Sequence, residues 1–272
     1  AYAILSGLVG SEMCIRDSYP GITVEKKIGF SQLNKLTKAR ILDLPGTYSL
    51  NASSMDESLV VELLLNKNDP DYPDVAVVIT AVENLKRNLK LFSQIKDLEI
   101  PTILVVNMSD QISRRGIKID VKKLKEKLNT EVILVSTRKN SGVSDLKKAL
   151  ADYRKLSVKP FMETKIIDKE YFESLKLAFP NQSPYKLWLV ITQDINFTKL
   201  DRQKVSDSSA FRSLPRSQLK NLQQREIIKR YQLINQILKE TYKKNLEDAA
   251  DLRSRLDNIL IHKIWGLSLI HI

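Results

Sequence analysis

The feature that most constrains the fold is an alternation of short apolar runs with amphipathic segments in the first half of the chain. The runs Asp74–Thr80, Pro101–Val106 and Val132–Val135 are rich in β-branched residues, which is typical of buried strands. Between them, Asn84–Asp97 and Val121–Leu128 space their apolar residues along one helical face. Buried strands separated by helices form parallel sheets, so the sequence predicts a doubly wound α/β sheet.

Other segments extend this pattern and then change it. A strand end is predicted at Arg40–Leu42, and helices are predicted at Asp56–Asn66 and Val143–Leu156. Beyond Pro160, β-branched runs become rare and the apolar spacing is helical. The helices predicted there are Asp168–Ala178, Pro184–Gln193, Gln218–Tyr242 and Leu246–Ile261. We therefore expect one α/β domain over residues 19–158 and a small all-helical domain over residues 159–266.

Composition narrows the classes of function. The 272 residues include 44 basic and 32 acidic side chains, and the formal net charge of +12 suits phosphate, anionic lipid or nucleic-acid partners. No run of lysines and arginines with interleaved aromatic residues appears, which argues against a nucleic-acid groove. The single cysteine, Cys14, cannot form an internal disulfide, and His262 and His271 are too few for a His/Cys metal cluster. No apolar run reaches the roughly 18 residues that a membrane helix needs.

The two ends of the chain differ from the rest in character. Residues 1–18 (AYAILSGLVGSEMCIRDS) lack the basic start of a signal peptide and look like translated sequencing-adapter sequence. Residues 267–272 (LSLIHI) have the same appearance. We therefore expect both ends to be non-native sequence, and the functional interpretation sets them aside together with Cys14 and His271.

A first candidate motif is the sequence DLPG, formed by Asp43, Leu44, Pro45 and Gly46 after a predicted strand. A carboxylate at a strand end can hold a Mg²⁺-bound water beside a nucleotide. The glycine lets its backbone N–H approach a γ-phosphate. Taken alone, the motif fits an ordinary turn equally well, because Asp and Gly are common turn residues.

A second candidate motif is the sequence NMSD, formed by Asn107, Met108, Ser109 and Asp110 directly after another predicted strand. In GTP-binding domains, the aspartate of such an NxxD turn accepts hydrogen bonds from the guanine N1–H and exocyclic amine. Adenine lacks this pair of donors, so the aspartate selects the base. Met108 stands where these turns usually carry lysine. The alternative is that Asp110 caps the start of a helix.

A third motif, Ser136-Thr137-Arg138, follows the predicted strand VILV and would place a backbone N–H against guanine O6. DxxG, NxxD and SxR thus follow one another in order, each at the carboxyl end of a predicted parallel strand. Ligands of open α/β sheets bind at that edge. The combination therefore indicates a GTP-binding domain, although none of the three motifs does so by itself.

A fourth segment, YPGITVE, lies before a stretch that predicts a β-hairpin. Within it, Gly21 and Ile22 precede Thr23, whose hydroxyl could bind Mg²⁺ and whose N–H could bind the γ-phosphate, as a switch threonine does. The alternative for this segment is a Pro-Gly turn with a surface threonine.

These residues together resemble the ferrous iron transport protein B family (FeoB). The resemblance is carried by YPGITVEKK at residues 19–27 and DLPGTYSLNASSMDE at residues 43–57, and it extends over residues 19–266. The region after Pro160 resembles the helical spacer of that family, which modulates nucleotide affinity. The segment DNILIHKIWG at residues 257–266 resembles the run that leads into the first transmembrane helix, with basic residues on the cytosolic side.

The resemblance implies a Ras-like P-loop-NTPase G domain followed by the helical domain. It implies slow GTP hydrolysis by a domain fused to a membrane domain that carries Fe²⁺ inward, at the cytoplasmic face of the bacterial inner membrane. The implied ligands are GTP or GDP, Mg²⁺ and K⁺. The implied partners are the protein's own membrane domain and a small Feo-type accessory protein, and not nucleic acid.

The resemblance also assigns roles by motif. Mg²⁺ is assigned to the Thr23 hydroxyl and, through water, to Asp43. No catalytic side chain is assigned, because Thr47 rather than a glutamine follows DxxG. The nucleotide contacts are assigned to Gly21, Ile22, Thr23, Asp43, Leu44, Pro45, Gly46, Asn107, Met108, Ser109, Asp110, Ser136, Thr137 and Arg138.

One departure from the family stands out. The phosphate-binding loop GxxxxGK[ST] occurs nowhere in the sequence, although it should lie shortly before Tyr19. We expect the first strand of the G domain to be missing with it, and the chain to be truncated at both ends. The sequence thus predicts that this polypeptide binds GTP feebly, whereas its parent protein binds and hydrolyses it.

Two other functions share part of this evidence. An RNA- or ribosome-associated GTPase would have the same motif order and a favourable charge, but the DLPGTYSL string and the helical domain fit it poorly. A degenerate, non-catalytic G domain acting as a regulator would explain the missing loop directly. The transporter interpretation accounts for more of the sequence than either alternative.

Overall fold

A computed structural model of the chain describes residues 2–6, 27–51, 55–192 and 214–244. Its centre is a six-stranded sheet in which five strands run in the same direction and the edge strand β2 runs antiparallel to its neighbour β3. The predicted doubly wound α/β sheet is confirmed. From one edge to the other, the strands are β2 (Lys27–Gln32), β3 (Lys38–Leu44), β1 (Tyr2–Ser6), β4 (Val75–Ala81), β5 (Thr102–Asn107) and β7 (Val132–Leu134).

The antiparallel pair β2–β3 is the predicted hairpin. Its register sets Lys27 opposite Asp43 and Gln32 opposite Lys38. In the connecting turn, the Asn34 side-chain oxygen accepts hydrogen bonds from two backbone N–H groups downstream, as Asx turns do. The hairpin therefore fixes Asp43 one residue before the end of β3, whereas the sequence placed it just beyond the strand.

The expectation that the first strand is missing is wrong. Strand β1 lies between β3 and β4, and its Leu5 is in register with Asp43 on one side and Val77 on the other. The foreign appearance of residues 1–18 had concealed this strand. A short apolar run is sufficient here, because its backbone groups pair with those of two flanking strands that would otherwise lack partners. The non-native origin of residues 1–18 stays a prediction.

Helices cover both faces of the sheet, and strand β4 shows the division. Its residues Ala76 and Val78 belong to a large core on the face covered by α1 (Met55–Leu65), α2 (Leu85–Asp97) and α3 (Val121–Leu128). The alternate residues Val75, Val77 and Ile79 belong to a second, smaller core. That core is closed by α4 (Val143–Ala151). Helix α4 ends five residues before the predicted Leu156, at a C-cap on Asp152.

The second half of the chain forms the predicted helices. They are α5 (Lys169–Ala178), α6 (Pro184–Thr192) and α8 (Arg216–Thr241). Edge-to-face contacts among Tyr171, Phe172 and Trp188 join α5 to α6. The predicted helix over Leu246–Ile261 lies outside the described residues.

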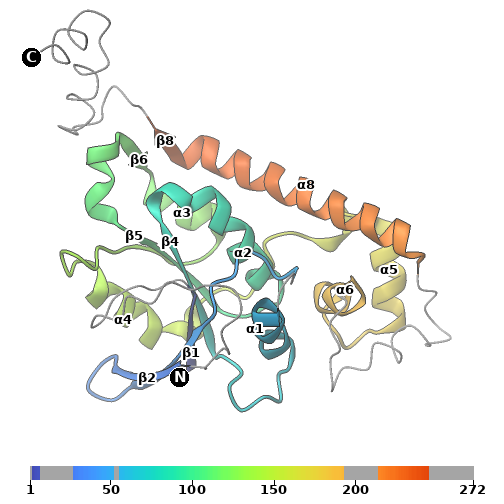
Figure 1. The fold of residues 1–272 in the computed structure, drawn as a ribbon, viewed down its shortest axis with the longest axis horizontal. Helices are drawn as coiled ribbons and strands as arrows, with labels where there is room; N and C mark the ends of the chain where they lie inside the picture. The colour runs from blue at the N-terminus through green and yellow to red at the C-terminus, as the bar shows by residue number, and fades with distance from the viewer. Residues whose placement is uncertain (1, 7–26, 52–54, 193–213, 245–272) are drawn as a thin grey trace, which may run out of the picture.

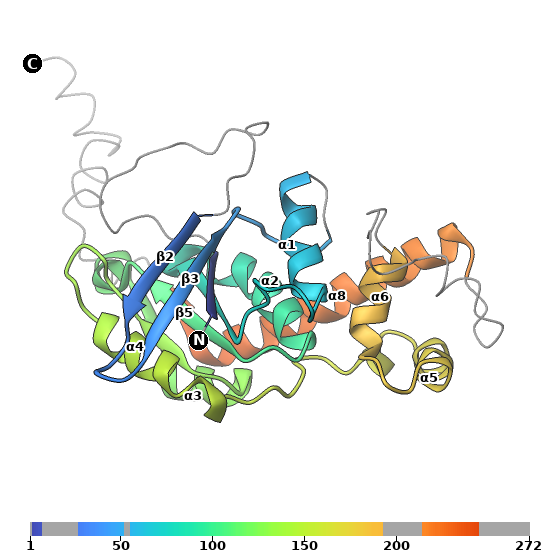
Figure 2. The ribbon, with the colours of Figure 1, turned by 90° about the horizontal axis from the view of Figure 1, so that it is seen from below.

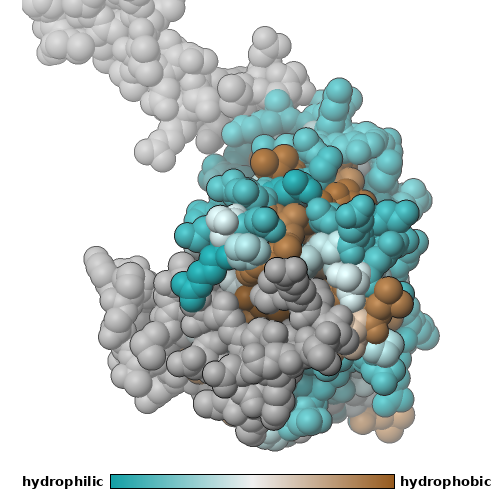
Figure 3. Space-filling view, turned by 90° about the vertical axis from the view of Figure 1, so that its right-hand side faces the viewer, coloured by the Kyte–Doolittle hydropathy of each residue, from teal (hydrophilic) through white to brown (hydrophobic). Residues whose placement is uncertain are grey.

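Helix α8 connects the two halves. It has 26 residues, a length of ~39 Å, and runs from beside α6 across α2 to α3 (Figures 1 and 2). Apolar residues of α5, α6 and α8 belong to the same continuous core as those of α1, α2 and α3. Because α2 lies between the sheet and α8, its residues from Leu91 to Asp97 are all buried. Seen from the end that carries α5 and α6, the surface is mostly hydrophilic, with apolar side chains gathered near its middle (Figure 3).

One strand of the second half departs from the all-helical expectation. After α8, β8 (Tyr242–Lys244) pairs antiparallel with β6 (Ile117–Ile119) of the first half. Three residues carry too short a pattern for either strand to be predicted from sequence. Short 3₁₀ helices fill the remaining connections: η1 (Val82–Asn84), η2 (Ser109–Gln111), η3 (Ser113–Arg115), η4 (Tyr153–Lys155) and η5 (Thr164–Ile166). Within the described ranges, no helix has both the length and the apolar composition that a membrane crossing requires.

Candidate functional site

The three described motifs lie along one edge of the sheet. Asp43 is near the carboxyl end of β3, Asn107 ends β5, and Ser136 follows β7 closely. Because β3, β5 and β7 all run in the same direction, these residues share the carboxyl edge, where ligands of open α/β sheets bind. Three strand spacings, ~14 Å, separate β3 from β5. The motifs are therefore spread along this edge rather than gathered at one point.

At one end of this edge, the NxxD and SxR turns are in direct contact. The Ser136 hydroxyl donates a hydrogen bond of 2.7 Å to Asp110 Oδ1. The Arg138 guanidinium lies 2.8 Å from Asp110 Oδ2. The hydrogen bond from Ser136 is the main cause that lowers the pKa of Asp110, and the Arg138 charge lowers it further. Asp110 is thus held as a carboxylate at the place where the sequence predicts base recognition.

The backbone conformation of Met108 sets the direction in which the chain leaves β5 in the NxxD turn. Met108 has a left-handed φ of 60°, which is uncommon outside glycine and turns the chain sharply after β5. Asn107 Oδ1 accepts a hydrogen bond from the Met108 N–H at 2.8 Å and one from the Thr137 N–H at 3.4 Å. The Ser109 N–H donates to the Val135 carbonyl at 3.1 Å. The two turns are therefore tied together by backbone groups as well as by side chains.

The SxR turn is closed on itself. Ser136 and Ser141 exchange two backbone hydrogen bonds of 3.0 and 3.1 Å. Immediately afterwards Gly142 adopts a φ of +81°, and a Cβ at this position would overlap the Leu134 carbonyl oxygen. Glycine is therefore required here to let the loop return beside β7 before α4 begins.

The DxxG motif lies further along the edge, on β3. Its residues make fewer contacts with neighbouring turns than the NxxD and SxR residues do. Asp43 is half-buried, and burial raises its pKa while the charge of Lys27, opposite it on β2, acts in the other direction. Gly46 is exposed, and a Cβ there would meet no atom within 4 Å. Within the described structure, nothing packed around Gly46 requires glycine at this position.

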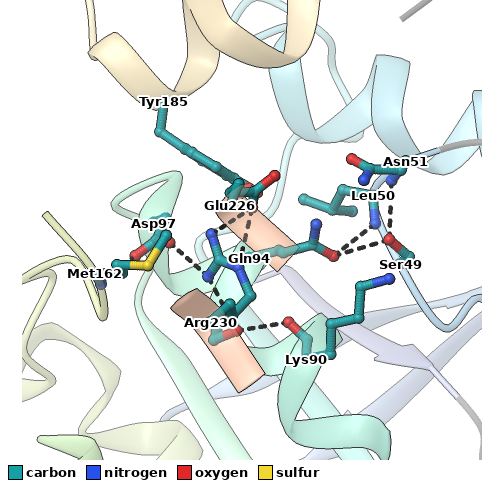
Figure 4. A network of polar contacts seen from close by, with 11 residues as sticks. Ser49, Leu50, Asn51, Lys90, Gln94, Asp97, Met162, Tyr185, Glu226 and Arg230 are labelled. Carbon is teal, nitrogen blue, oxygen red and sulfur yellow. Dashed lines mark hydrogen bonds and ion pairs between the residues drawn. The ribbon is translucent and has the colours of Figure 1, made fainter. Parts of the chain in front are cut away.

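The segment after DxxG is anchored to helix α2, an interaction that the sequence did not predict. The Gln94 side-chain oxygen accepts hydrogen bonds from the Leu50 N–H at 2.9 Å and from the Ser49 hydroxyl at 3.2 Å. Figure 4 shows Gln94 between this segment and a buried cluster around Arg230. Tyr48 points outward, and the Arg87 guanidinium of α2 lies 3.5 Å from the centre of its ring. Helix α2 thus holds the chain just beyond the DxxG turn.

The buried cluster joins α2 to the helical half (Figure 4). Arg230 of α8 is fully buried and lies 2.7 Å from Asp97 Oδ2 and 2.8 Å from Glu226 Oε1. The Asp97 Oδ1 atom accepts a hydrogen bond from the Met162 N–H at 2.9 Å. Tyr185 of α6 donates to Glu226 at 3.3 Å. We name Asp97, Tyr185, Glu226 and Arg230 the interior cluster. Nothing in the local sequence signals it, because its members come from three separate helices.

Three of the predicted site residues, Gly21, Ile22 and Thr23, lie outside the described residues. The structure brings the NxxD and SxR residues together and places Asp43, Leu44, Pro45 and Gly46 further along the same edge.

Mg²⁺ is the metal that the family resemblance implies. Asp43 fits the position of a carboxylate that contacts Mg²⁺ through water. Mg²⁺ in nucleotide sites is held by one or two carboxylates, waters and substrate phosphates rather than by a full set of protein ligands. A half-buried carboxylate at the carboxyl edge suits the outer position of such a site. The described residues contain no group of three or more His, Cys, Asp or Glu side chains that could hold a metal by themselves.

Comparison with known proteins identifies a family model that matches the first part of the chain and curated relatives that match nearly all of it. A family model described as "Ferrous iron transport protein B" matches residues 3–150, which is more than half of the chain. The "Fe(2+) transporter FeoB" of Leptospira biflexa is 31% identical over 269 residues, covering 92% of this chain and 37% of that protein. The Staphylococcus aureus (strain MSSA476) protein of the same description is 28% identical, covering 97% of this chain and 40% of that protein. The chain thus spans about two fifths of the length of these curated relatives.

Solved structures share the fold over most of the chain. The cytosolic domain of the T. maritima FeoB iron transporter in its apo form matches with a TM-score of 0.72 and 21% identity, covering 89% of this chain and 99% of that one. The cytosolic domain of L. pneumophila FeoB matches with a TM-score of 0.66 and 25% identity, covering 90% of this chain and all of that one. Because both matches extend through the helical half, the sheet and the helices after it form an arrangement already seen in those domains.

Proposed function

Because this chain belongs to the ferrous iron transport protein B family, we propose that it is the guanine-nucleotide-binding and -hydrolysing cytosolic part of an Fe²⁺ transporter at the cytoplasmic face of the bacterial inner membrane. The observation that carries the proposal is the Asp110 carboxylate, held by Ser136 at the carboxyl edge of a parallel sheet. Relatives of this chain are Fe²⁺ transporters, and the T. maritima domain has been solved in GDP and GMPPNP forms. These relatives favour the transporter over an RNA-linked GTPase or a degenerate regulator.

Base selection follows from the chemistry of Asp110. An ionised carboxylate only accepts hydrogen bonds, and guanine offers two adjacent donors, N1–H and the exocyclic amine. Adenine has no such pair. In the present structure, Arg138 is bound to Asp110 Oδ2. Since the Arg138 side chain is 63% exposed, a guanine base can displace its guanidinium into solvent at small cost.

Fewer groups of this chain are available to contact the phosphates of the nucleotide than to contact its base. Asp43 and the N–H of Gly46 would face the γ-phosphate, and Thr23 would complete this side. Mg²⁺, when bound, neutralises charge on the phosphate oxygens. The chain supplies no GxxxxGK[ST] loop, so the backbone cradle and the lysine that usually hold the β- and γ-phosphates are missing from its sequence. We therefore propose that this polypeptide recognises guanine but binds the nucleotide weakly, with Mg²⁺ and K⁺ as cofactors of the intact protein.

Titration of the chain with GDP, followed by amide NMR shifts, tests this proposal even when binding is weak. We expect GDP to shift the amides of the NxxD turn and of the SxR turn, and we expect ADP to leave them unchanged. Asp110→Asn should lose the response to GDP and gain one to xanthosine diphosphate, because the amide then donates to the carbonyl at position 2 of xanthine. Asp145→Asn, an exposed carboxylate on α4, is the matched control.

Two results would contradict the proposal. If ADP and GDP shifted the same amides equally, Asp110 would not select the base. If GDP shifted neither turn at any concentration while the fold was intact, the carboxyl edge would not be a nucleotide site in this chain. Tight, Mg²⁺-dependent binding would overturn the expectation of weak affinity and leave the base assignment standing.

A further inference from the structure

More than half of the formal net positive charge of the chain lies at one end of the molecule. We name residues 111–128 and 239–244 the basic end; they comprise η3, β6, α3, the last turn of α8 and β8. They contain ten lysines and arginines against three acidic residues, which leaves +7 of the formal +12 of the whole chain. Figure 1 shows β6, α3 and β8 gathered at the end opposite α5 and α6. The two stretches are over 100 residues apart in sequence, so only the fold makes them one surface.

The small sheet concentrates this charge. Pairing of β6 with β8 sets Lys118 directly opposite Lys243 and brings Lys244 beside Ile117. Like charges that face each other across a sheet repel and weaken the pairing. Lys118, Lys243 and Lys244 are all exposed, so their charges are accessible from outside. A surface of this kind is stabilised when an external anion approaches it.

Two of the three acidic residues of the basic end, Asp120 and Glu240, contact other residues of the basic end. Asp120 caps α3 by accepting a hydrogen bond from the Lys123 N–H at 3.0 Å. Glu240 lies 3.0 Å from Lys123 Nζ and 3.2 Å from Lys127 Nζ, and hydrogen bonds from these two lysines lower its pKa. Glu240 therefore offsets charge on α3, and Arg115 and Lys125 pair with Glu83 and Glu131, which lie outside the basic end. None of these ion pairs involves Lys243 or Lys244 of β8.

The position of the basic end in the chain indicates what it faces. The described structure ends at Lys244, in β8, so the chain continues from this surface. The relatives are about two and a half times as long as this chain, and under the proposed function the remainder of the protein lies in a membrane. Basic residues next to membrane segments favour the cytoplasmic side, where anionic lipids attract them.

We propose that the basic end binds the anionic headgroup surface of the membrane and sets the orientation of the cytosolic part on it. The inference rests on the proposed function for the presence of a membrane, and on the charge of the described residues for the contact. Lipid is favoured over RNA because Tyr242 is the only aromatic residue in these two stretches, and single-stranded nucleic acid is bound by rows of stacking aromatic side chains.

Sedimentation of the 272-residue chain with lipid vesicles tests the inference. Vesicles of phosphatidylcholine with about one third phosphatidylglycerol should bind the chain, and pure phosphatidylcholine vesicles should not. Binding should be strong at about 0.05 M salt and largely lost at about 0.5 M salt, because the headgroup attraction is screened. The variant K118E/K243E/K244E should bind the anionic vesicles at least about a hundredfold more weakly, since each lysine contributes about fivefold.

A second variant with the same change of charge is the control. Lys169, Lys176 and Lys220 are exposed and lie on α5 and at the start of α8, at the opposite end of the molecule. The variant K169E/K176E/K220E should keep more than half of the vesicle binding. Thermal unfolding should show that both variants fold as the parent chain does. A folded basic-end variant that still binds would place the contact elsewhere, for example in residues 245–272.

Three further outcomes would overturn the inference. They are the absence of binding to anionic vesicles, an equal loss in the two charge-reversal variants, and displacement of vesicles by RNA that is bound more tightly. None of them bears on nucleotide binding, because the GDP titration reports on the Asp110 turn. Conversely, a chain that failed to respond to GDP while binding anionic vesicles would keep the lipid contact and reject the nucleotide-binding part of the proposed function.

Discussion

Two arginine–aspartate pairs in this molecule have the same chemistry and opposite surroundings. At the carboxyl edge, Arg138 lies 2.8 Å from Asp110, and the arginine side chain is 63% exposed. In the interior cluster, Arg230 lies 2.7 Å from Asp97, and neither side chain is exposed. Arg138 can exchange its carboxylate for water or for a ligand. Arg230 cannot, because every group around it has been removed from water and must find its partner within the protein.

The difference shows that the same pair of residue types has different roles when it is exposed and when it is buried. At the edge, a weakly held arginine leaves a carboxylate available for recognition. In the interior, Arg230 of α8 binds Asp97 of α2 and Glu226 of α8, and Tyr185 of α6 donates to the same Glu226 oxygen. These contacts connect the helical half to the helix that lies on the sheet. Burial raises the pKa of Asp97, and the Arg230 charge opposes that rise. The interior cluster therefore fixes how the helices are arranged, and the carboxylate of Asp110 at the edge is available to bind a ligand.

The largest effect is expected from Arg230→Met. Removing the guanidinium leaves Asp97 and Glu226 buried without their cation, which costs about 3–5 kcal/mol of the free energy of unfolding. Urea unfolding followed by circular dichroism measures this loss. Arg138→Met is the matched control, since removal of an exposed partner changes stability by less than about 1 kcal/mol. Equal losses in the two variants would remove the distinction between edge and interior.

A second effect concerns pH and the interior lysine Lys96. Its side chain is fully buried, with Nζ 2.8 Å from the Asn129 carbonyl and 3.1 Å from the Ser157 carbonyl. Burial lowers the pKa of Lys96 to about 8, whereas the unfolded chain keeps the ordinary value of 10.5. Between these values the unfolded chain binds more protons than the folded one, so stability rises with pH.

Comparison of the parent chain with Lys96→Met isolates this contribution. We expect the parent to gain about 2 kcal/mol over the variant between pH 8 and pH 10.5, a discounted share of what the lowered pKa corresponds to. Lys155→Met, whose lysine is 80% exposed, should give no such difference. A flat difference between parent and Lys96→Met over this range would show that the lysine is not desolvated.

A third, smaller effect is expected from Gln94→Leu. The change removes the acceptor of the Ser49 hydroxyl and the Leu50 N–H, and one lost hydrogen bond of this kind costs about 1 kcal/mol. Hydrogen exchange should show the Leu50 amide opening about five- to tenfold more often. Gln111→Leu, which alters a hydrogen bond of an exposed side chain, is the control. Unchanged exchange at Leu50 would mean that α2 does not anchor this segment.

The smallest effect is expected at the edge itself. Ser136→Ala removes the main cause that lowers the pKa of Asp110, so that pKa should rise. Carbon-detected NMR titration of the carboxyl group measures it. Global stability should change by less than about 1 kcal/mol. A pKa of Asp110 that stayed where it was would show that Ser136 does not hold the carboxylate.

Most of the sheet and the NxxD and SxR motifs could be predicted from the sequence because their segments carry strong local patterns. Long β-branched runs such as Val75–Ala81 and strongly periodic helices such as Val121–Leu128 carry their own pattern. The base-side turns follow such strands directly, so their order along the chain gives their place along the edge. Strand β1 was missed because residues 1–18 were set aside as foreign sequence. Strands β6 and β8 were missed because three residues show no distinctive pattern and depend on their partners for pairing.

Local sequence patterns are sufficient to predict that a parallel sheet forms and that Asp43, Asp110 and Ser136 lie at its carboxyl edge, because local periodicity sets each element and parallel connection sets the direction of the strands. The contact of Arg230 with Asp97, 133 residues away in the chain, and the pairing of Lys118 with Lys243 become apparent only in the folded chain. These contacts depend on how α8 crosses α2. Such a crossing is fixed by the packing of whole helices, and no local run of residues encodes it.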